Sequence, residues 1–272
     1  MNSAYRHLAA AAALAFLAAP CAAEDPIRVL LLSGSNNHKW QETTPVIKSV
    51  LERSGRFTVD VTEDSANLKP DAFAPYRLVF SNFNDFGKKP PFKWSDDTKK
   101  AFLDHLAKGN GFVALHAGSS VFYDWPEFQA YCCGTWKNGT NHGAIHVNQV
   151  VFSGEPSPIT DGLKPFWIRD EFWQKILVAP GARSHATVTP DPKFRGSGKP
   201  EPILFTVEKN GGRGCGYFLG HDTITMNNTA WQTLLLRCSE WAATGKVTIA
   251  PHADWPATKA DAERMAQTPA KP

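Results

Sequence analysis

The first half of the chain alternates short apolar runs with polar segments that carry helix signals. Residues 27–33 (IRVLLLS) form a continuous apolar run that is typical of a buried strand. Residues 43–55 show apolar residues at helical spacing, with Pro45 near the start and Gly55 as a stop signal. Further strand and helix patterns of the same kind occupy residues 57–63, 76–83, 95–109 and 111–116. This alternation predicts a mainly parallel sheet with helices on both faces, an α/β fold.

The pattern is less regular in the second half, where strand signals dominate. A short helix is expected at residues 125–134 and a closing helix at 229–245. Strand patterns occupy residues 144–152, 185–189, 203–207 and 214–220. We therefore expect antiparallel insertions in the second half of the sheet. Residues 190–202 are rich in turn formers and predict a surface loop.

The two ends of the chain differ in composition from the middle. Residues 1–23 combine an early arginine, a short Ala/Leu run and small residues before Glu24, which predicts a secretory signal peptide. The mature protein is then expected to be soluble and exported, either periplasmic or secreted. We expect one domain over residues 24–250, and a polar, frayed tail over residues 251–272.

Charge and cysteine content narrow the class of partner. The net charge is only +3 and the basic residues are scattered, which argues against nucleic acid and against a membrane surface. A small-molecule partner is the remaining expectation. Four cysteines follow the predicted leader, and none has the C-x-x-C spacing, so we expect structural thiols, with the disulfide pattern left open.

Histidine is the residue type that points to chemistry. Six histidines lie at expected strand ends or in loops beside glycine, namely His38, His116, His142, His146, His185 and His221. The carboxyl ends of parallel strands meet at one edge of a sheet, and ligands bind there in α/β proteins. We therefore expect His38, His116 and His221 to converge, although 78 and 105 residues separate consecutive members. Of the neighbours His142 and His146, one is expected in the site.

Several other polar residues have two interpretations. Asp170 and Glu171 stand between apolar and aromatic residues, where a carboxylate has a raised pKa or is held by a cation; the alternative is a salt bridge to Arg169 or Lys175. Asp222 follows His221 and could orient the imidazole or build a turn. The segment 82–87 (NFNDFG) could bind sugar hydroxyls or form a turn.

Two common catalytic motifs are missing. The loop around His38 lacks the spacing of a phosphate-binding or dinucleotide-binding motif. The strand at residues 111–115 is followed by His116 and only small residues, not by the G-x-S-x-G turn of serine hydrolases. The sequence therefore disfavours a hydrolase with a serine nucleophile, since His116 occupies the position of the nucleophile.

Motifs in a fixed order extend over most of the chain. They include VLLLSGSNNHKWQETTPVIKSVLE, GNGFVALHAGSSVFYDWPEFQAYCCGTW, HGAIHV, RDEFWQ and GRGCGYFLGHD. Between about residues 27 and 243 this set closely resembles the ThuA-like (trehalose utilisation) family. The resemblance implies the flavodoxin-like fold of class I glutamine amidotransferases, with His116 in place of the nucleophilic cysteine. The positions that match the family's histidines and acid are His38, His116, His142, Glu171 and His221.

The resemblance also implies a chemistry. Family members resemble partners of sugar dehydrogenases, so a 3-keto glycoside is the expected substrate, processed by a lyase, hydrolase or isomerase reaction. His116, Glu171 and His221 are the expected catalytic residues. A divalent metal, with Zn²⁺ best suited to imidazole ligands, is expected on His38, His116, His142 and His221.

Two further expectations concern the sugar and the alternative function. Four tryptophans near the motif residues could offer apolar faces to a pyranose ring, namely Trp40, Trp125, Trp136 and Trp173. The alternative function is a non-catalytic carbohydrate-binding or partner-binding module on the same fold. The sequence leaves the oligomeric state open.

Overall fold

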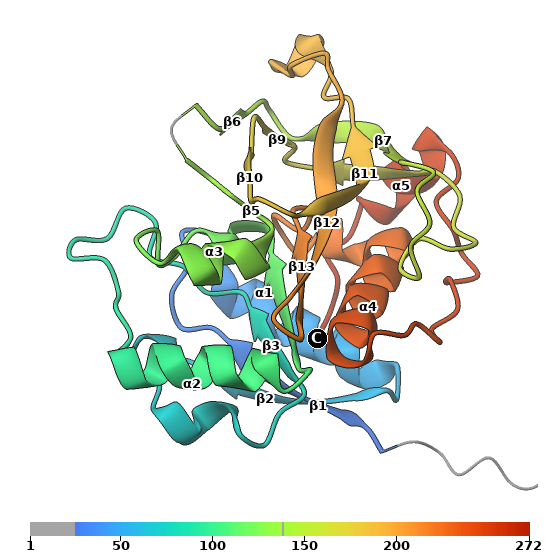
Figure 1. The fold of residues 1–272 in the computed structure, drawn as a ribbon. Coiled ribbons are helices and arrows are strands. Elements are labelled where there is room, and N and C mark those ends of the chain that lie inside the picture. Colours follow the sequence, from blue (N-terminus) through green and yellow to red (C-terminus); the bar gives the residue numbers. More distant parts are fainter. Residues whose placement is uncertain (1–24, 138) are drawn as a thin grey trace, which may run out of the picture.

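Five parallel strands form the first half of the central sheet. The computed structural model describes residues 25–137 and 139–272, so the expected leader lies outside the described residues (Figure 1). In spatial order the parallel strands are β2 (Phe57–Thr62), β1 (Ile27–Leu32), β3 (Leu78–Ser81), β4 (Gly111–Leu115) and β13 (Gly212–Tyr217). Numbered along the chain, this order is 2-1-3-4-5, which is the flavodoxin-like order.

Antiparallel strands extend the same sheet beyond β13. They are β12 (Glu201–Lys209), β11 (Arg183–Val188), β7 (His146–Phe152) and β8 (Phe166–Asp170), in that spatial order. Two short antiparallel pairs lie outside the main sheet: β5 (Gly134–Thr135) with β10 (Leu177–Val178), and β6 (Asn141–His142) with β9 (Trp173–Gln174). The predicted α/β class, with antiparallel strands in the second half, is confirmed.

Helices cover both faces of the sheet, as predicted. Helices α1 (Trp40–Arg53) and α4 (Thr229–Thr244) pack on one face, and α2 (Asp96–Ala107) and α3 (Pro126–Cys132) on the other (Figure 1). The Ser95 hydroxyl accepts a hydrogen bond from Thr98 N at 3.1 Å and caps α2. Helix α1 begins at Trp40, three residues earlier than the sequence pattern predicts.

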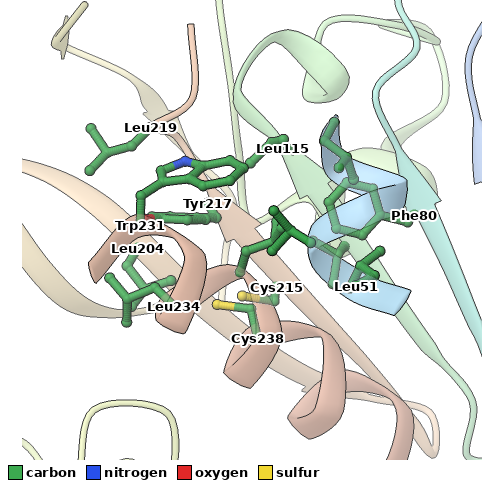
Figure 2. Close-up of a cluster of buried hydrophobic side chains, with 14 of the residues drawn as sticks. Leu51, Phe80, Leu115, Leu204, Cys215, Tyr217, Leu219, Trp231, Leu234 and Cys238 are labelled. Carbon is green, nitrogen blue, oxygen red and sulfur yellow. The ribbon is translucent and has the colours of Figure 1, made fainter. Parts of the chain in front are cut away.

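Strands β1, β3 and β4 contribute side chains to two cores, one on each face of the sheet, whereas the edge strand β2 is buried on one face only. In Figure 2, Leu51 of α1 and Trp231 and Leu234 of α4 face strand residues such as Tyr217. A second cluster, rich in phenylalanine, lies under α2 and α3. Burial on both faces holds the central strands in place, and the loops that follow them lie at one edge of the sheet.

The four cysteines of the described chain are buried free thiols: Cys132, Cys133, Cys215 and Cys238. This agrees with the expectation of structural thiols. Cys215 and Cys238 lie within the core on the α4 side of the sheet (Figure 2). No helix within residues 25–137 and 139–272 combines the length and apolar character needed to cross a bilayer.

The C-terminal segment corrects one expectation. Residues 251–272 were expected to fray, but helix α5 (Lys259–Met265) forms there. Thr258 and Asp261 make a reciprocal capping box, which satisfies backbone N–H groups at the start of this short helix. Ala262 and Met265 are buried. The helix was not predicted because most residues of this segment are polar. Its two buried apolar side chains pack the segment against the rest of the protein.

Candidate functional site

Three loops that follow parallel strands bring distant histidines together. His38 follows β1, His116 follows β4 and His221 follows β13. The ring centre of His38 lies 4.8 Å from that of His116 and 4.8 Å from that of His221. The rings of His116 and His221 are 5.8 Å apart. The expected convergence at the carboxyl edge of the sheet is therefore present.

The Glu171 carboxylate lies at the centre of this cluster. It follows β8 and is buried. Its Oε1 accepts a hydrogen bond from Trp173 Nε1 at 3.0 Å and lies 3.7 Å from His116 Nε2. Its Oε2 lies 3.3 Å from His142 Nδ1 and 3.5 Å from His221 Nε2. One acidic group thus faces three imidazoles.

His116 is held in one orientation and one tautomer. Its Nδ1 lies 3.1 Å from the Phe218 carbonyl oxygen, which can only accept, so the ring proton is on Nδ1. Burial, together with the neighbouring His38 and His221, holds the pKa of His116 well below its ordinary value, and the ring is neutral. Nε2 is buried and has no hydrogen-bond partner among the described residues.

The backbone at His116 explains the small residues that follow it. His116 has φ 44°, in the left-handed region, where the chain turns sharply out of β4. A Cβ atom on Gly118 would lie 2.1 Å from the Ser81 carbonyl oxygen of β3. The turn therefore requires glycine at this position in order to pack on the neighbouring strand.

His38 is oriented by two asparagines. Its Nδ1 lies 3.1 Å from Asn36 Oδ1, an acceptor that also receives Asn84 Nδ2 at 2.7 Å. The proton of His38 is therefore on Nδ1, and Nε2 is unprotonated. Burial and the neighbouring His221 and His142 lower the pKa of His38 to about 4.

His221 has a carboxylate on its far side. Its Nδ1 lies 3.4 Å from Asp222 Oδ2, and Arg169 donates to both oxygens of Asp222 at 3.0 and 3.2 Å. Burial by itself lowers the pKa of His221, but Asp222 and Glu171 outweigh it and the net pKa is raised. Arg169 thus pairs with Asp222 and not with the neighbouring acids. Asp222 also accepts from Thr225 N at 2.8 Å, so it both orients the imidazole and builds a turn.

Of the two neighbouring histidines, only His142 belongs to the site. His142 lies on the short strand β6 and faces Glu171. His146 lies on β7, where its ring stacks on Phe194 with centres 4.6 Å apart. Phe194 belongs to the loop predicted at residues 190–202, so His146 has a packing role beneath that loop.

Asp170 is a structural neighbour of the site. It accepts hydrogen bonds from the backbone N–H groups of Gly220 at 2.7 Å, His221 at 3.2 Å and Glu171 at 2.7 Å. Burial raises the pKa of Asp170 to about 7, although the Gly220 N–H group acts in the opposite direction. Asp170 therefore joins the loop after β13 to the end of β8 and places His221 beside Glu171.

The segment 82–87 builds a turn, as one of its two interpretations predicted. Asn82 donates to the hydroxyls of Thr43 and Thr44 at 3.1 and 3.0 Å. Asp85 accepts from Phe92 N at 2.7 Å. The bond from Asn84 to Asn36 supports His38. This supporting role has no local signal in the sequence, because the two asparagines are 48 positions apart.

A pocket of about 300 Å³ opens beside the histidines. Its walls include four of the five motif positions, namely three histidines and the glutamate, together with two tryptophans. The full set of wall residues is Asn37, His38, Phe86, Ala117, Ser120, Trp136, His142, Glu171, Trp173 and His221. Of the four tryptophans expected near a sugar, Trp136 and Trp173 line this pocket. Trp125 instead packs in the core under α3, and Trp40 begins α1.

One subset of these side chains has the compactness of a cation site. Ligand atoms of His38, Glu171 and His221 all lie within 4.8 Å of one another. Two imidazole nitrogens and a carboxylate oxygen are a common zinc donor set. Metal-bound histidines commonly have a carboxylate next to their other ring nitrogen, and Asp222 lies 3.4 Å from Nδ1 of His221.

Comparison with known proteins identifies the family. The sequence model of the ThuA family, described as trehalose utilisation, matches residues 28–242. The chain belongs to the ThuA family. The match spans β1 to α4 and includes all five histidine and glutamate positions of the candidate site. No curated protein matches the chain.

Solved structures agree with this assignment. A ThuA-like protein from Parabacteroides merdae ATCC 43184 is 32% identical, with a TM-score of 0.76, over 86% of this chain and 95% of its own. A ThuA-like protein from Bacteroides uniformis ATCC 8492 is 17% identical, with a TM-score of 0.60, over 83% of this chain and 95% of its own. The second similarity shows the shared fold alone. The flavodoxin-like order of the parallel strands described above is the fold shared with these structures.

Proposed function

We propose that this ThuA chain is an exported, metal-assisted enzyme that cleaves or isomerises oxidised glycosides of the 3-keto type. One observation carries the proposal: the buried Glu171 carboxylate, the unprotonated Nε2 of His38 and the rings of His142 and His221 line one small pocket, with the neutral His116 ring beside them. The family description, trehalose utilisation, supports a carbohydrate substrate. The leader pattern in residues 1–23 supports export.

The donor set fits a divalent cation. His116 and His38 each have Nδ1 engaged, so both are neutral and offer Nε2 as a ligand. The lone pair of His116 Nε2 faces an oxygen of Glu171 across 3.7 Å, which is unfavourable unless a cation or a proton lies between them. We propose that His38, Glu171 and His221 hold Zn²⁺ or a similar ion, with His116 next to it.

The pocket residues suggest how the substrate is activated. The C3 carbonyl of a 3-keto sugar acidifies the proton on C2. His142 lines the pocket, and its Nδ1 lies 2.8 Å from the Gly143 carbonyl oxygen, so Nε2 is free to accept a proton. A bound divalent cation supplies charge stabilisation for the oxygens that become negative. His116 does not belong to the set of residues that line the pocket, so we propose a positioning role for it.

The proposed reaction is an elimination. His142 takes the C2 proton, and the C2–H electron pair forms the C1–C2 double bond as the C1–O bond breaks. The leaving oxygen departs with the bonding pair and takes the proton back from His142. If the C1 substituent is retained, protonation of C2 on the opposite face by water gives an isomer, and His142 releases its proton to the hydroxide that remains. Trp136 and Trp173 offer apolar faces to the ring during these steps.

Metal content is the first test. Elemental mass spectrometry of the purified protein should find close to one metal ion per chain. His38→Ala and His221→Ala should lose it, because each removes one of the three proposed ligands. His252→Ala is the matched control, since His252 is exposed and lies after α4, outside the site. Absence of metal from every preparation would reject the metal-assisted mechanism.

Substrate turnover is the second test. A panel of 3-keto glycosides is incubated in D₂O with and without chelator, and exchange at C2 and release of the aglycone are followed by NMR. We expect both signals to depend on metal and on His142. Unchanged 3-keto glycosides, together with measurable sugar binding, would instead support the non-catalytic carbohydrate-binding module.

A further inference from the structure

A second hollow lies directly beside the site pocket. This outer groove has a volume of about 910 Å³, and its walls come from the loops after β3, β4, β5 and β9. It shares two walls with the site pocket, Phe86 and Trp136. The Trp136 ring lies 6.3 Å from that of Phe86, 5.0 Å from that of Trp173 and 5.9 Å from that of His142. Trp136 therefore stands between the two hollows and contacts both.

The size of the inner pocket limits what it can hold. Its volume of about 300 Å³ is at the lower end of the range for ligand pockets, which suits one sugar ring. A substituent on C1 of that ring must leave the inner pocket. The outer groove, which continues past Trp136 and Phe86, is the adjoining space of sufficient size.

The walls of the outer groove are mostly apolar. Ile176 and Leu177 line it beside the aromatic residues, and Leu177 is 52% exposed. The Thr140 hydroxyl, which also lines it, is engaged internally: it donates to the Lys175 carbonyl oxygen at 3.0 Å and accepts from Lys137 N at 3.2 Å. These walls offer apolar contact together with two lysine ammonium groups and the Tyr123 hydroxyl, which has no hydrogen-bond partner among the described residues. They therefore suit a flat ring that carries a single polar or anionic oxygen.

We propose that the outer groove binds the leaving group of the substrate, and that this leaving group is aromatic, so that the preferred substrates are aryl glycosides. This inference rests on the proposed function, because it takes the inner pocket as the site of the reacting sugar. Lys137 and Lys175 also line the groove, and positive charge suits a phenolate as it departs. A phenolate is also a better leaving group in the elimination than a sugar alkoxide.

Binding is tested without turnover. Calorimetry measures the binding of three unoxidised ligands to the protein without its expected leader. The ligands are 4-nitrophenyl glucoside, methyl glucoside and trehalose. We expect the aryl glucoside to bind about tenfold more tightly than the other two, because its ring buries apolar surface. Equal binding of all three, or tighter binding of trehalose, would overturn the proposal.

Two neighbouring residues of β10 provide a matched pair of variants. Leu177 lines the groove, whereas Val178, 40% exposed on the same strand, is not part of its walls. We expect Leu177→Asn to weaken aryl glucoside binding about fivefold and to leave methyl glucoside binding unchanged. Val178→Asn should change neither. Circular dichroism checks folding, and Leu177→Ala replaces the asparagine variant if that one does not fold.

The two proposals can fail separately. If aryl glucosides bind preferentially in a Leu177-dependent way but 3-keto aryl glucosides are not turned over, the groove stands and the catalytic proposal fails. If 3-keto methyl glucoside is turned over as efficiently as the aryl compound, and Leu177→Asn has no effect, the catalytic proposal stands and the groove proposal is wrong.

Discussion

Nε2 of His116 faces Oε1 of Glu171 at 3.7 Å, while Nδ1 of the same ring is held by the Phe218 carbonyl. The proton on Nδ1 leaves a lone pair directed at a carboxylate oxygen. Both side chains are buried, so water does not screen the repulsion. A cation next to this pair would remove the conflict, which is why the pair supports a metal site more strongly than the number of histidines does.

The first prediction concerns His116 itself. His116→Asn keeps a residue type that tolerates the left-handed backbone at this position but removes the imidazole. We expect zinc affinity to fall about 10–100-fold, as for other groups that support a metal site. Competition against a chelating dye measures this affinity. His252→Asn is the control, and equal affinity in the two variants would contradict the expected role.

The second prediction concerns the pKa of His221 in metal-free protein. Burial lowers this pKa, and Asp222 and Glu171 reverse the effect. Asp222→Asn should therefore shift the pKa of His221 downward and keep the ring neutral to lower pH. NMR titration of the histidine ring signals measures the shift, with Asp254→Asn as a control because Asp254 pairs with Arg264 at the surface. An unchanged titration would show that Asp222 does not act on His221.

The third prediction links His105 to stability. Burial, Lys108 and Arg77 lower the pKa of His105 to about 4, and Asn110 donates to its Nδ1 at 3.1 Å. The folded protein therefore favours neutral His105, so this contribution is complete above about pH 6.5 and is lost as pH falls toward 4. Between pH 7 and pH 5 the loss should be about 2 kcal/mol.

Urea unfolding at the two pH values measures this contribution. We expect His105→Gln to show a smaller decrease in the free energy of unfolding than the unmodified protein. His252→Gln should keep the full decrease, because His252 is exposed. An equal decrease in all three proteins would mean that His105 does not titrate on unfolding.

The fourth prediction tests whether the C-terminal segment contributes to stability. Met265 of α5 is only 6% exposed and lies against Thr229 at the start of α4. Met265→Ala should lower the free energy of unfolding by about 2 kcal/mol, since it removes buried methylene and sulfur contacts. Glu263→Ala, on the exposed face of the same helix, should stay within about 0.5 kcal/mol. Equal stability of both variants would show that the segment contributes nothing to the stability of the fold and behaves as a frayed tail.

Much of the fold could be predicted because its signals are local. Apolar runs such as residues 27–33 and 111–115 are buried on both faces, and the Ser95 cap marks the start of α2. The C-terminal helix was missed because two apolar residues in a polar stretch carry too weak a periodic signal. Its contacts are with residues far earlier in the chain.

The site was only partly predictable. The topology of a parallel sheet brought His38, His116 and His221 together, as expected from the strand ends alone. Sequence placed Glu171 among the catalytic residues but did not place it at the centre of the imidazoles. Only the tertiary structure separates His142 from His146, because their roles depend on which distant residue each ring contacts: Glu171 for His142 and Phe194 for His146.

The sequence by itself determined the order of strands and helices and the sheet edge where the imidazoles meet, because hydrophobic period and capping act between near neighbours. Only the tertiary structure decided which imidazole nitrogens are free. That choice depends on the Phe218 carbonyl, 102 positions from His116, and on Asn84, which holds the Asn36 oxygen beside His38. The proton of a neutral imidazole is on the nitrogen that has a hydrogen-bond acceptor next to it, and only folding brings these acceptors to the rings.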